Sequence, residues 1–197
     1  MKRRRSNSEE EEDEESHVKV IGNKIIFYWD VTNKSCFDII SALHEAKENL
    51  SSGSQTNEII LHICTHGGDV YPALGLISQI ENFPSKIITV TEGCVASAGV
   101  LIALAGHERW MTKNSYMLIH EIRSSCWGRY SECQDDLQNQ NLLMKDLKEY
   151  LVNKTRRKLR GQELDNVLRH DLLWNSDKCL KTKLVSKIIW KKNVSDS

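Results

Sequence analysis

Apolar runs and helical spacings alternate along most of the chain. Strand-like runs rich in isoleucine and valine occur at residues 21–29 (a turn and then a strand), 58–64, 86–91 and 115–120, and helical spacing occurs at residues 35–50, 71–82, 97–105 and 131–155. The strands carry little polar alternation and are separated by helices, which is typical of a parallel sheet covered on both faces. The pattern therefore predicts an α/β fold.

The longest of the predicted helices covers residues 131–155. At 1.5 Å per residue it would be about 37 Å long, so it would project beyond so small a domain. Gln140 is the polar exception in an apolar stripe that consists of Tyr130, Cys133, Leu137, Met144, Leu147 and Leu151. From this pattern, packing against the helix's own domain and a role in subunit assembly are both open.

The first 16 residues differ in composition from the rest of the chain. Residues 2–5 are all basic, and residues 9–15 are all acidic. Like charges repel one another, and such a segment cannot bury enough apolar surface to fold. We therefore expect a disordered tail at residues 1–16 and one folded domain over residues 17–197.

The charge balance limits the classes of function. The chain has 197 residues, with 27 basic and 27 acidic side chains and a formal net charge of zero. This neutrality argues against a nucleic-acid binder, which would carry a basic surplus. No apolar run reaches the roughly 18 residues of a transmembrane helix, and the charged N-terminus is unlike a secretory signal peptide. We expect no membrane association and a cytoplasmic location.

The 6 cysteines are scattered and form no C-x-x-C pair. Several lie inside apolar runs, as Cys64 does. This distribution favours reduced, buried thiols in a cytosol-like compartment over a disulfide framework. The spacing gives no support for a zinc site.

Three chemically distinctive features stand at the carboxyl ends of predicted strands. They are the pair Gly67–Gly68, Ser97 and His120. Sites in open parallel sheets form at this edge, where loops and helix N-termini converge. A serine hydroxyl becomes a nucleophile when a base takes its proton, and histidine titrates in the right range. Together these residues would supply a nucleophile, a base and a backbone N–H donor.

The residues around Ser97 are almost all small: Gly93, Ala96, Ala98 and Gly99. They allow a sharp turn from strand into helix, as at a nucleophile elbow, although the flanking glycines of G-x-S-x-G are absent. At a helix N-terminus, unpaired N–H groups and the helix dipole favour a developing negative charge. The alternative is that Ser97 only caps the helix.

Three segments resemble the signature blocks of the ClpP-type serine peptidases. They are residues 65–70 (Thr-His-Gly-Gly-Asp-Val), 93–99 (Gly-Cys-Val-Ala-Ser-Ala-Gly) and 114–120 (Asn-Ser-Tyr-Met-Leu-Ile-His). The resemblance runs from about residue 18 to residue 190. It implies a ClpP/crotonase-like spiral of ββα units with a long protruding helix, in which subunits stack into rings.

The same resemblance implies roles for the site residues. Ser97 would be the nucleophile and His120 the general base. The backbone N–H groups of Gly68 and Ala98 would form the oxyanion hole. The resemblance implies no metal and no organic cofactor.

The third member of such a triad is an acid that orients the histidine. The family has an aspartate shortly before a Gly-Leu-Val-Asp segment, which corresponds here to residues 183–186, and Asp171 lies twelve residues before that segment begins. We therefore expect Asp171. Asp177 is a rival that falls inside the following helix pattern. Glu121 is a second rival, but it should point away from His120 because successive strand residues face opposite sides.

The chain departs from the family pattern at several positions. His66 replaces the proline that often precedes the glycine pair, Glu121–Ile122 replaces Gln-Pro after the histidine, and Lys183 replaces a glycine. The first two changes would reshape the substrate groove without removing a catalytic group. Ring members that dock an AAA+ unfoldase carry a mainly apolar N-terminal segment, so the acidic run argues against dependence on such an ATPase.

These observations favour a serine endopeptidase that cleaves peptides and unfolded proteins within a homo-oligomeric ring. A catalytically inactive ClpP-like ring subunit with a structural role is the main alternative, against which an intact triad argues. A crotonase-type enzyme acting on acyl-CoA would share the fold, but its chemistry does not need a serine beside a histidine.

Overall fold

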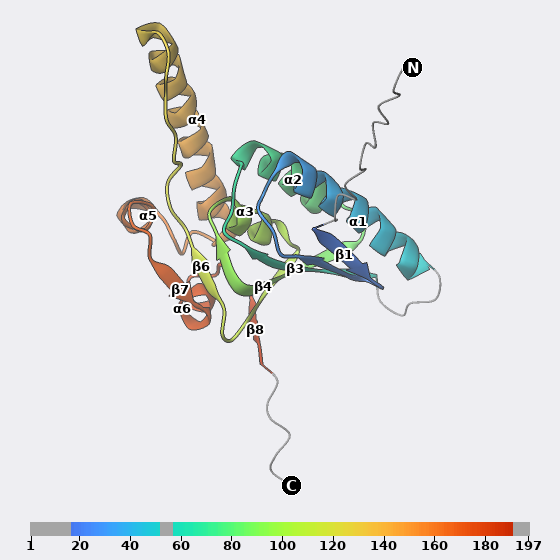
Figure 1. Cartoon of the computed structure of the whole chain (residues 1–197). Helices are drawn as coiled ribbons and strands as arrows, with labels where there is room; N and C mark the ends of the chain where they lie inside the picture. The colour runs from blue at the N-terminus through green and yellow to red at the C-terminus, as the bar shows by residue number, and fades with distance from the viewer. Residues whose placement is uncertain (1–16, 52–56, 191–197) are drawn as a thin grey trace, which may run out of the picture.

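The computed structural model describes residues 17–51 and 57–190, which form one eight-stranded sheet and six helices (Figure 1). The strands are β1 (Val18–Ile21), β2 (Lys24–Phe27), β3 (Glu58–Thr65), β4 (Lys86–Ala96), β5 (Glu108–Thr112), β6 (Tyr116–Leu118), β7 (Leu173–Asn175) and β8 (Lys187–Ile189). The helices are α1 (Asn33–Ser51), α2 (Val70–Glu81), α3 (Ala98–Ala105), α4 (Tyr130–Lys154), α5 (Gly161–Leu168) and α6 (Ser176–Lys181). The expected disordered tail, residues 1–16, lies outside the described residues.

The α/β class expected from the sequence is confirmed, with differences in detail. The run at residues 21–29 is a hairpin of β1 and β2, and its turn contains Gly22 at a φ of 61°. β4 continues to Ala96, beyond the predicted end. The apolar pattern misses β5, where Glu108 and Arg109 interrupt it, and it misses β7 and β8 because each has three residues.

The sheet is parallel except at two strands, β1 and β7. The strand order is β1-β2-β3-β4-β5-β8, with β6 also pairing with β4, and β7 with β6. The pairs β2–β3, β3–β4, β4–β5, β4–β6 and β5–β8 are parallel, whereas β1–β2 and β6–β7 are antiparallel. The carboxyl ends of β3, β4 and β6 therefore meet at one edge, as the sequence predicts.

The expectation that helices cover both faces of the sheet is wrong for β3. Helices α1, α2 and α3 lie on one side of the sheet in Figure 1. Along β3, buried residues alternate with half-buried ones, and His62 and Cys64 belong to the half-buried set. Only in β4 does a run of consecutive residues, 87–91, lie fully buried. Apolar composition alone does not separate these two environments, because isoleucine occupies both faces of β3.

Helix α3 is buried on every side, and it carries the turn that holds Ser97. All of its residues are buried, which is typical of a helix in the centre of a core. The hydroxyl of Thr89 on β4 donates to the carbonyl oxygen of Ala103 at 2.6 Å, so the sheet also holds the helix by a polar contact. A Cβ on Gly99 would lie 2.3 Å from Thr65 Cγ2. The absence of that atom lets the start of α3 pack closely on the end of β3.

Helix α4 projects from the rest of the chain, as the sequence predicts (Figure 1). Its last turns are attached to the core: Lys154 Nζ lies 2.7 Å from Glu81 Oε1, and Arg109 Nη1 donates to the carbonyl oxygen of Lys154 at 2.7 Å. Burial and the neighbouring Glu81 carboxylate raise the pKa of the Tyr150 hydroxyl, which donates to the carbonyl oxygen of Leu101 at 3.2 Å. Among the described residues, no helix is long and apolar enough to span a membrane.

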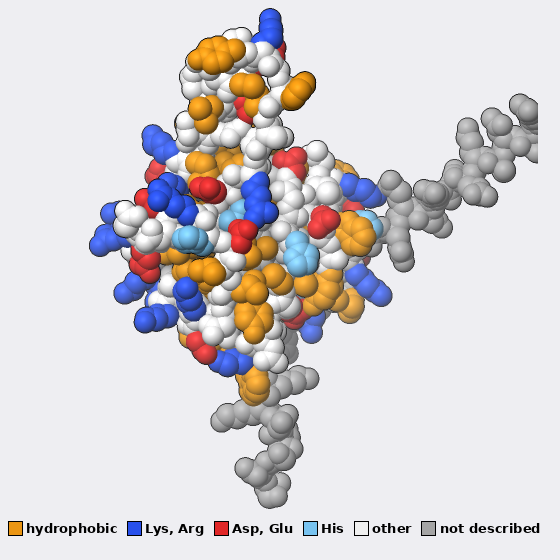
Figure 2. Space-filling view, turned by 60° about the vertical axis from the view of Figure 1, so that its left-hand side comes forward, with side chains coloured by type: hydrophobic (Ala, Val, Ile, Leu, Met, Phe, Trp, Pro, Cys, Tyr) orange, Lys and Arg blue, Asp and Glu red, His pale blue; other side chains and the backbone are white. Residues whose placement is uncertain are grey.

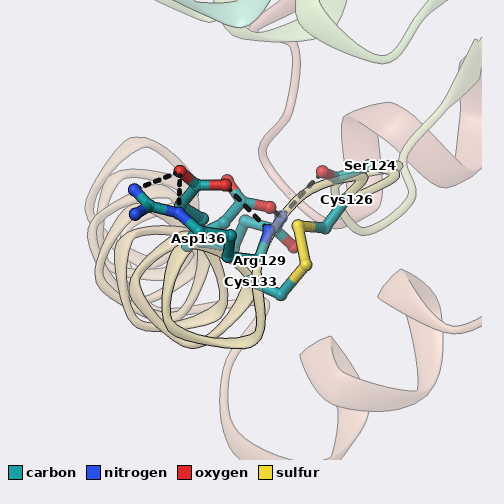
Figure 3. The surroundings of a disulfide bond; sticks show 7 residues. Ser124, Cys126, Arg129, Cys133 and Asp136 are labelled. Atoms are coloured by element: carbon teal, nitrogen blue, oxygen red, sulfur yellow. Dashed lines mark hydrogen bonds and ion pairs between the residues drawn. A yellow bond between two sulfur atoms is a disulfide. The ribbon is translucent and has the colours of Figure 1, made fainter.

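The expectation that all cysteines are reduced is wrong for one pair. Cys126 and Cys133 form a disulfide, with their Cα atoms 5.7 Å apart (Figure 3). The free cysteines are Cys36 and Cys179, which are buried, and Cys64 and Cys94, which are half-buried. The sequence does not reveal this pair, because Cys126 reaches the first turns of α4 only when the chain folds back before that helix.

Candidate active site

A cavity of about 520 Å³ lies between the carboxyl edge of the sheet and the base of α4. Its lining includes Gly68, Ser97, Ala98 and His120, so the structure brings together four of the five residues expected from the sequence. Asp171 is not part of the lining. Figure 2 shows the face below the protruding helix, where histidine, acidic, basic and apolar side chains are mixed.

Ser97 occupies a sharp turn between β4 and α3. Its φ is 55° and its ψ is −128°, an uncommon conformation for a residue with a side chain. The Ser97 N–H donates to the carbonyl oxygen of Leu118 on β6 at 2.9 Å, which ties the turn to the neighbouring strand. The side chain makes no capping hydrogen bond to α3. The capping alternative therefore fails, and the geometry is that of a strand-to-helix elbow that exposes a hydroxyl.

Gly67 allows the loop after β3 to lie against this elbow. Its φ is 100°, and a Cβ there would stand 2.7 Å from Ser97 Cβ and 3.2 Å from the Ala98 nitrogen. Real Cβ atoms do not approach other carbons so closely. A glycine is therefore required where the two chain segments meet.

The N–H of Gly68 is left available by the way its loop is attached. Val31 N–H donates to the Gly67 carbonyl oxygen at 2.8 Å, and Asp69 N–H donates to the Val31 carbonyl oxygen at 2.9 Å. Gly68 itself faces Val31, because a Cβ at Gly68 would lie 2.2 Å from the Val31 oxygen. In such a parallel bridge, the N–H of the intervening residue points to the opposite side.

The second expected donor is the N–H of Ala98, the first residue of α3. The first N–H groups of a helix have no partner within the helix, and the helix dipole adds a partial positive charge there. Both Gly68 and Ala98 line the cavity beside Ser97. This end of the cavity therefore suits a negatively charged oxygen.

His120 follows β6 by two residues. Its Nδ1 lies 2.5 Å from the carbonyl oxygen of Glu121. A carbonyl oxygen can only accept, so Nδ1 carries the hydrogen in this contact and Nε2 has a free lone pair. A histidine in this tautomer can accept a proton through Nε2.

Asp171 does not line the cavity, and its carboxylate contacts Arg123, a residue that does. Its carboxylate accepts a hydrogen bond from Arg123 Nη2, and both side chains are exposed. In the antiparallel β6–β7 pair, Leu118 is opposite Leu173. Two residues further along each chain, the same register places His120 opposite Asp171, although the strands themselves end before that point.

The two rival acids have other surroundings. Asp177 lies in α6, and both of its carboxylate oxygens are 2.7 Å from Lys113 Nζ. Glu121 lines the cavity, and its N–H donates to the carbonyl oxygen of Leu168 at 2.8 Å. Neither carboxylate is placed opposite His120 by the pairing of β6 and β7.

Apolar side chains form a large part of the remaining cavity wall. They include Leu101, Ile122, Leu143, Met144 and Leu147. Met144 and Leu147 belong to the apolar stripe of the long helix, so this stripe was the sequence signal that could have identified them as lining residues.

Two charged residues of the cavity lining, Arg123 and Lys148, could not be found from the sequence pattern. Gln140, the polar exception in the apolar stripe of α4, also lines the cavity. Lys148 Nζ donates to Asp165 at 2.8 Å, and this hydrogen bond lowers the pKa of the Asp165 carboxyl group.

Comparison with known proteins identifies a family to which the chain is similar. A model of the Clp protease family matches residues 8–192 of this chain. The match covers all three segments from which the site is built.

Curated relatives give the same picture at low identity. The chain is 26% identical over 182 residues to the ATP-dependent Clp protease proteolytic subunit 2 of Synechococcus sp. (strain CC9605), covering 89% of this chain and 88% of that protein. The protein of the same name from Parasynechococcus marenigrum (strain WH8102) is 24% identical over 182 residues, with the same coverage of 89% and 88%. A shorter match is 32% identical over 74 residues to the ATP-dependent Clp protease proteolytic subunit of Lactococcus lactis subsp. cremoris (strain SK11). It covers 36% of this chain and 37% of that protein.

Proposed function

This chain belongs to the Clp protease family, and we propose that it is a serine endopeptidase that cleaves peptides and unfolded proteins. One observation carries the proposal. Ser97, at an elbow with positive φ, opens into the same cavity as His120 and the backbone of Gly68 and Ala98.

The proposed reaction uses acyl-enzyme chemistry. Ser97 Oγ attacks the peptide carbonyl carbon while His120 Nε2 takes the hydroxyl proton. The carbonyl oxygen becomes an oxyanion, which the N–H groups of Gly68 and Ala98 stabilise. One such donor is worth on the order of 3 kcal/mol in the transition state. His120 then protonates the leaving amine, and a water molecule, activated by the same histidine, releases the acyl group.

Asp171 is the proposed third member of the triad. A continuation of the β6–β7 register by two residues would bring it opposite His120, which supports this assignment over Asp177. To act, its carboxylate must exchange Arg123 for the Nδ1–H of His120. That contact would fix the tautomer and stabilise the imidazolium that forms during the reaction.

We also propose a homo-oligomeric ring. Large apolar side chains remain exposed on and before α4, among them Trp127, Tyr130, Leu137 and Leu142. A protruding helix with such a surface suits contact with further subunits. The curated relatives are named ATP-dependent, so an AAA+ ATPase is a candidate partner, although the acidic N-terminal run argues against dependence on one. A cytoplasmic location remains part of this proposal.

One observation favours an inactive ring subunit as the second candidate. The acid and the histidine each have another partner: Asp171 binds Arg123, and His120 contacts the Glu121 carbonyl oxygen. In an inactive subunit these contacts would persist when a substrate is bound.

A fluorophosphonate probe tests the proposal directly, because it reacts covalently with activated serines. We expect mass spectrometry of the labelled protein to find the adduct on Ser97. Ser97→Ala is the control that should abolish labelling while the fold is retained, and Ser115→Ala, at another serine that follows a turn, should label normally. A folded, assembled wild-type protein that takes up no label and cleaves no peptide would support the inactive subunit instead.

A further inference from the structure

The segment between His120 and helix α4 forms one wall of the cavity. We call residues 121–129 the connecting segment. It has no regular secondary structure, and all of its residues are exposed except Ile122, which is half-buried. Glu121, Ile122, Arg123 and Ser124 line the cavity, opposite residues of α4 such as Gln140 and Leu147. The width of the groove therefore depends on how closely this segment lies along α4.

The near end of the connecting segment is attached by hydrogen bonds. Glu121 N–H donates to the Leu168 carbonyl oxygen at 2.8 Å. Ile122 N–H points to the sulfur of Met144 at 3.4 Å, and sulfur is a weak acceptor. Further along, Gln140 Nε2 donates to Ser124 Oγ at 2.7 Å, at an exposed position where water competes for both groups.

The far end is attached covalently. The Cys126–Cys133 disulfide joins the segment to the first turns of α4, in the cluster drawn in Figure 3. The other contact there is Arg129 with Glu132, an exposed pair within the same turn, which contributes little. Apart from the peptide bond that continues into α4, the disulfide is the one attachment of the far end that does not open thermally, because the rest of the segment buries so little surface.

We infer that the Cys126–Cys133 disulfide is a redox-sensitive clamp on the substrate groove. This inference rests on the proposed peptidase function and adds a regulation to the same site. When the bond is closed, residues 121–125 are held against α4 and present a preformed wall to the peptide. When the bond is reduced, the wall must be ordered at the time of binding, which lowers the affinity for the peptide. The chemical step at Ser97 is unaffected.

The redox step is an ordinary thiol–disulfide exchange with a dithiol. Cys126 is exposed and Cys133 half-buried, so the bond is accessible to a small reductant. A thiolate of the dithiol attacks one sulfur, forms a mixed disulfide and displaces the other cysteine as a thiolate. The second thiol of the reductant then closes its own disulfide and releases the first cysteine. The protein gains two electrons and two protons, and the dithiol loses them. A disulfide oxidant such as oxidised glutathione reverses the reaction.

The test compares the full-length wild type with Cys126→Ser/Cys133→Ser, each with and without dithiothreitol. For a fluorogenic peptide, we expect reduction of the wild type to raise KM about tenfold while kcat changes less than about twofold, the sign of a lost interaction that is equal in ground and transition states. The double variant should have the raised KM under both conditions. Its insensitivity to dithiothreitol would exclude effects through the four free cysteines. Oxidised glutathione should restore the wild-type KM in the same sample. This reversal tests the clamp on the wild type alone, even if the double variant folds poorly.

A second measurement does not depend on activity. In a Ser97→Ala background, trypsin should cleave after Arg123 and Arg129 faster when the disulfide is reduced. The connecting segment, once released from the disulfide, fits into the active site of trypsin more readily. Equal cleavage rates and an unchanged KM would overturn the clamp and leave the disulfide as a static crosslink. Labelling of Ser97 by the fluorophosphonate separates the two proposals. Labelled protein with an unchanged KM refutes only the clamp, whereas protein that labels in neither redox state refutes the peptidase.

Discussion

Arg123 holds the carboxylate of Asp171, the acid proposed to orient His120. At the same time, His120 Nδ1 contacts the Glu121 carbonyl oxygen at 2.5 Å. Both partners of the expected His–Asp contact are therefore engaged by the connecting segment, which supplies Arg123 and Glu121. The tautomer needed for a general base is already present, but the carboxylate that would stabilise the imidazolium is paired with Arg123.

Removal of Arg123 should free Asp171 to reach His120. Exposed ion pairs contribute little, so we expect Arg123→Met to raise kcat by only a few-fold. Arg129→Met is the matched control, since Arg129 forms an exposed ion pair on the same segment with Glu132. A lower kcat in Arg123→Met alone would show that Arg123 supports the site.

Asp171→Asn tests the assignment of the acid. The change keeps the size of the side chain but favours the wrong histidine tautomer, so we expect turnover to fall by about 10⁴. Asp177→Asn should keep near-normal activity, because its carboxylate pairs with Lys113 on another part of the surface. Steady-state kinetics of the two variants decide between the acids. The opposite pattern would assign the role to Asp177.

Gly67→Ala tests the close approach of the loop to the serine elbow. The new Cβ would be placed 2.7 Å from Ser97 Cβ, so the elbow must shift. A displacement of about 1 Å at a catalytic group costs on the order of 100-fold in rate. We therefore expect fluorophosphonate labelling to slow by about that factor.

Gly22→Ala is the matched control for this prediction. Gly22 also has a positive φ, 61°, but a Cβ there would meet nothing within 4 Å. Backbone strain at the new alanine should lower the free energy of unfolding by about 1–2 kcal/mol. The fluorophosphonate should nevertheless label Ser97 at the wild-type rate. If both variants label slowly, general destabilisation explains the loss, and thermal melts of the two proteins would reveal it.

The sequence predicts the parts of this site that depend on local chemistry. Small residues around Ser97 predict a tight turn, and strand ends predict that Gly68, Ser97 and His120 meet at one edge, as they do.

What the sequence does not reveal depends on how chain segments are placed against one another in space. The disulfide requires the chain to fold back before α4, and the partner of Asp171 lies 48 residues away at Arg123. The open face of β3 is a further example, because isoleucine side chains occur on both of its sides. Periodicity within one segment carries no information about such pairings.

The surface of α4 provides the last prediction, which concerns assembly. Leu151 is buried in its own domain, so it cannot report on contacts between subunits, whereas Leu137 is 58% exposed near the projecting end. If this surface packs against another copy, Leu137→Asp places an unpaired carboxylate in an apolar interface at a cost of several kcal/mol. We expect the variant to separate into smaller units and to lose activity. Gln138→Asp adds the same charge at the adjacent exposed position and should remain assembled if it faces solvent. Size-exclusion chromatography with light scattering measures both. A wild-type monomer with full peptidase activity would refute the ring, and the assignment of Ser97 and His120 would stand without it.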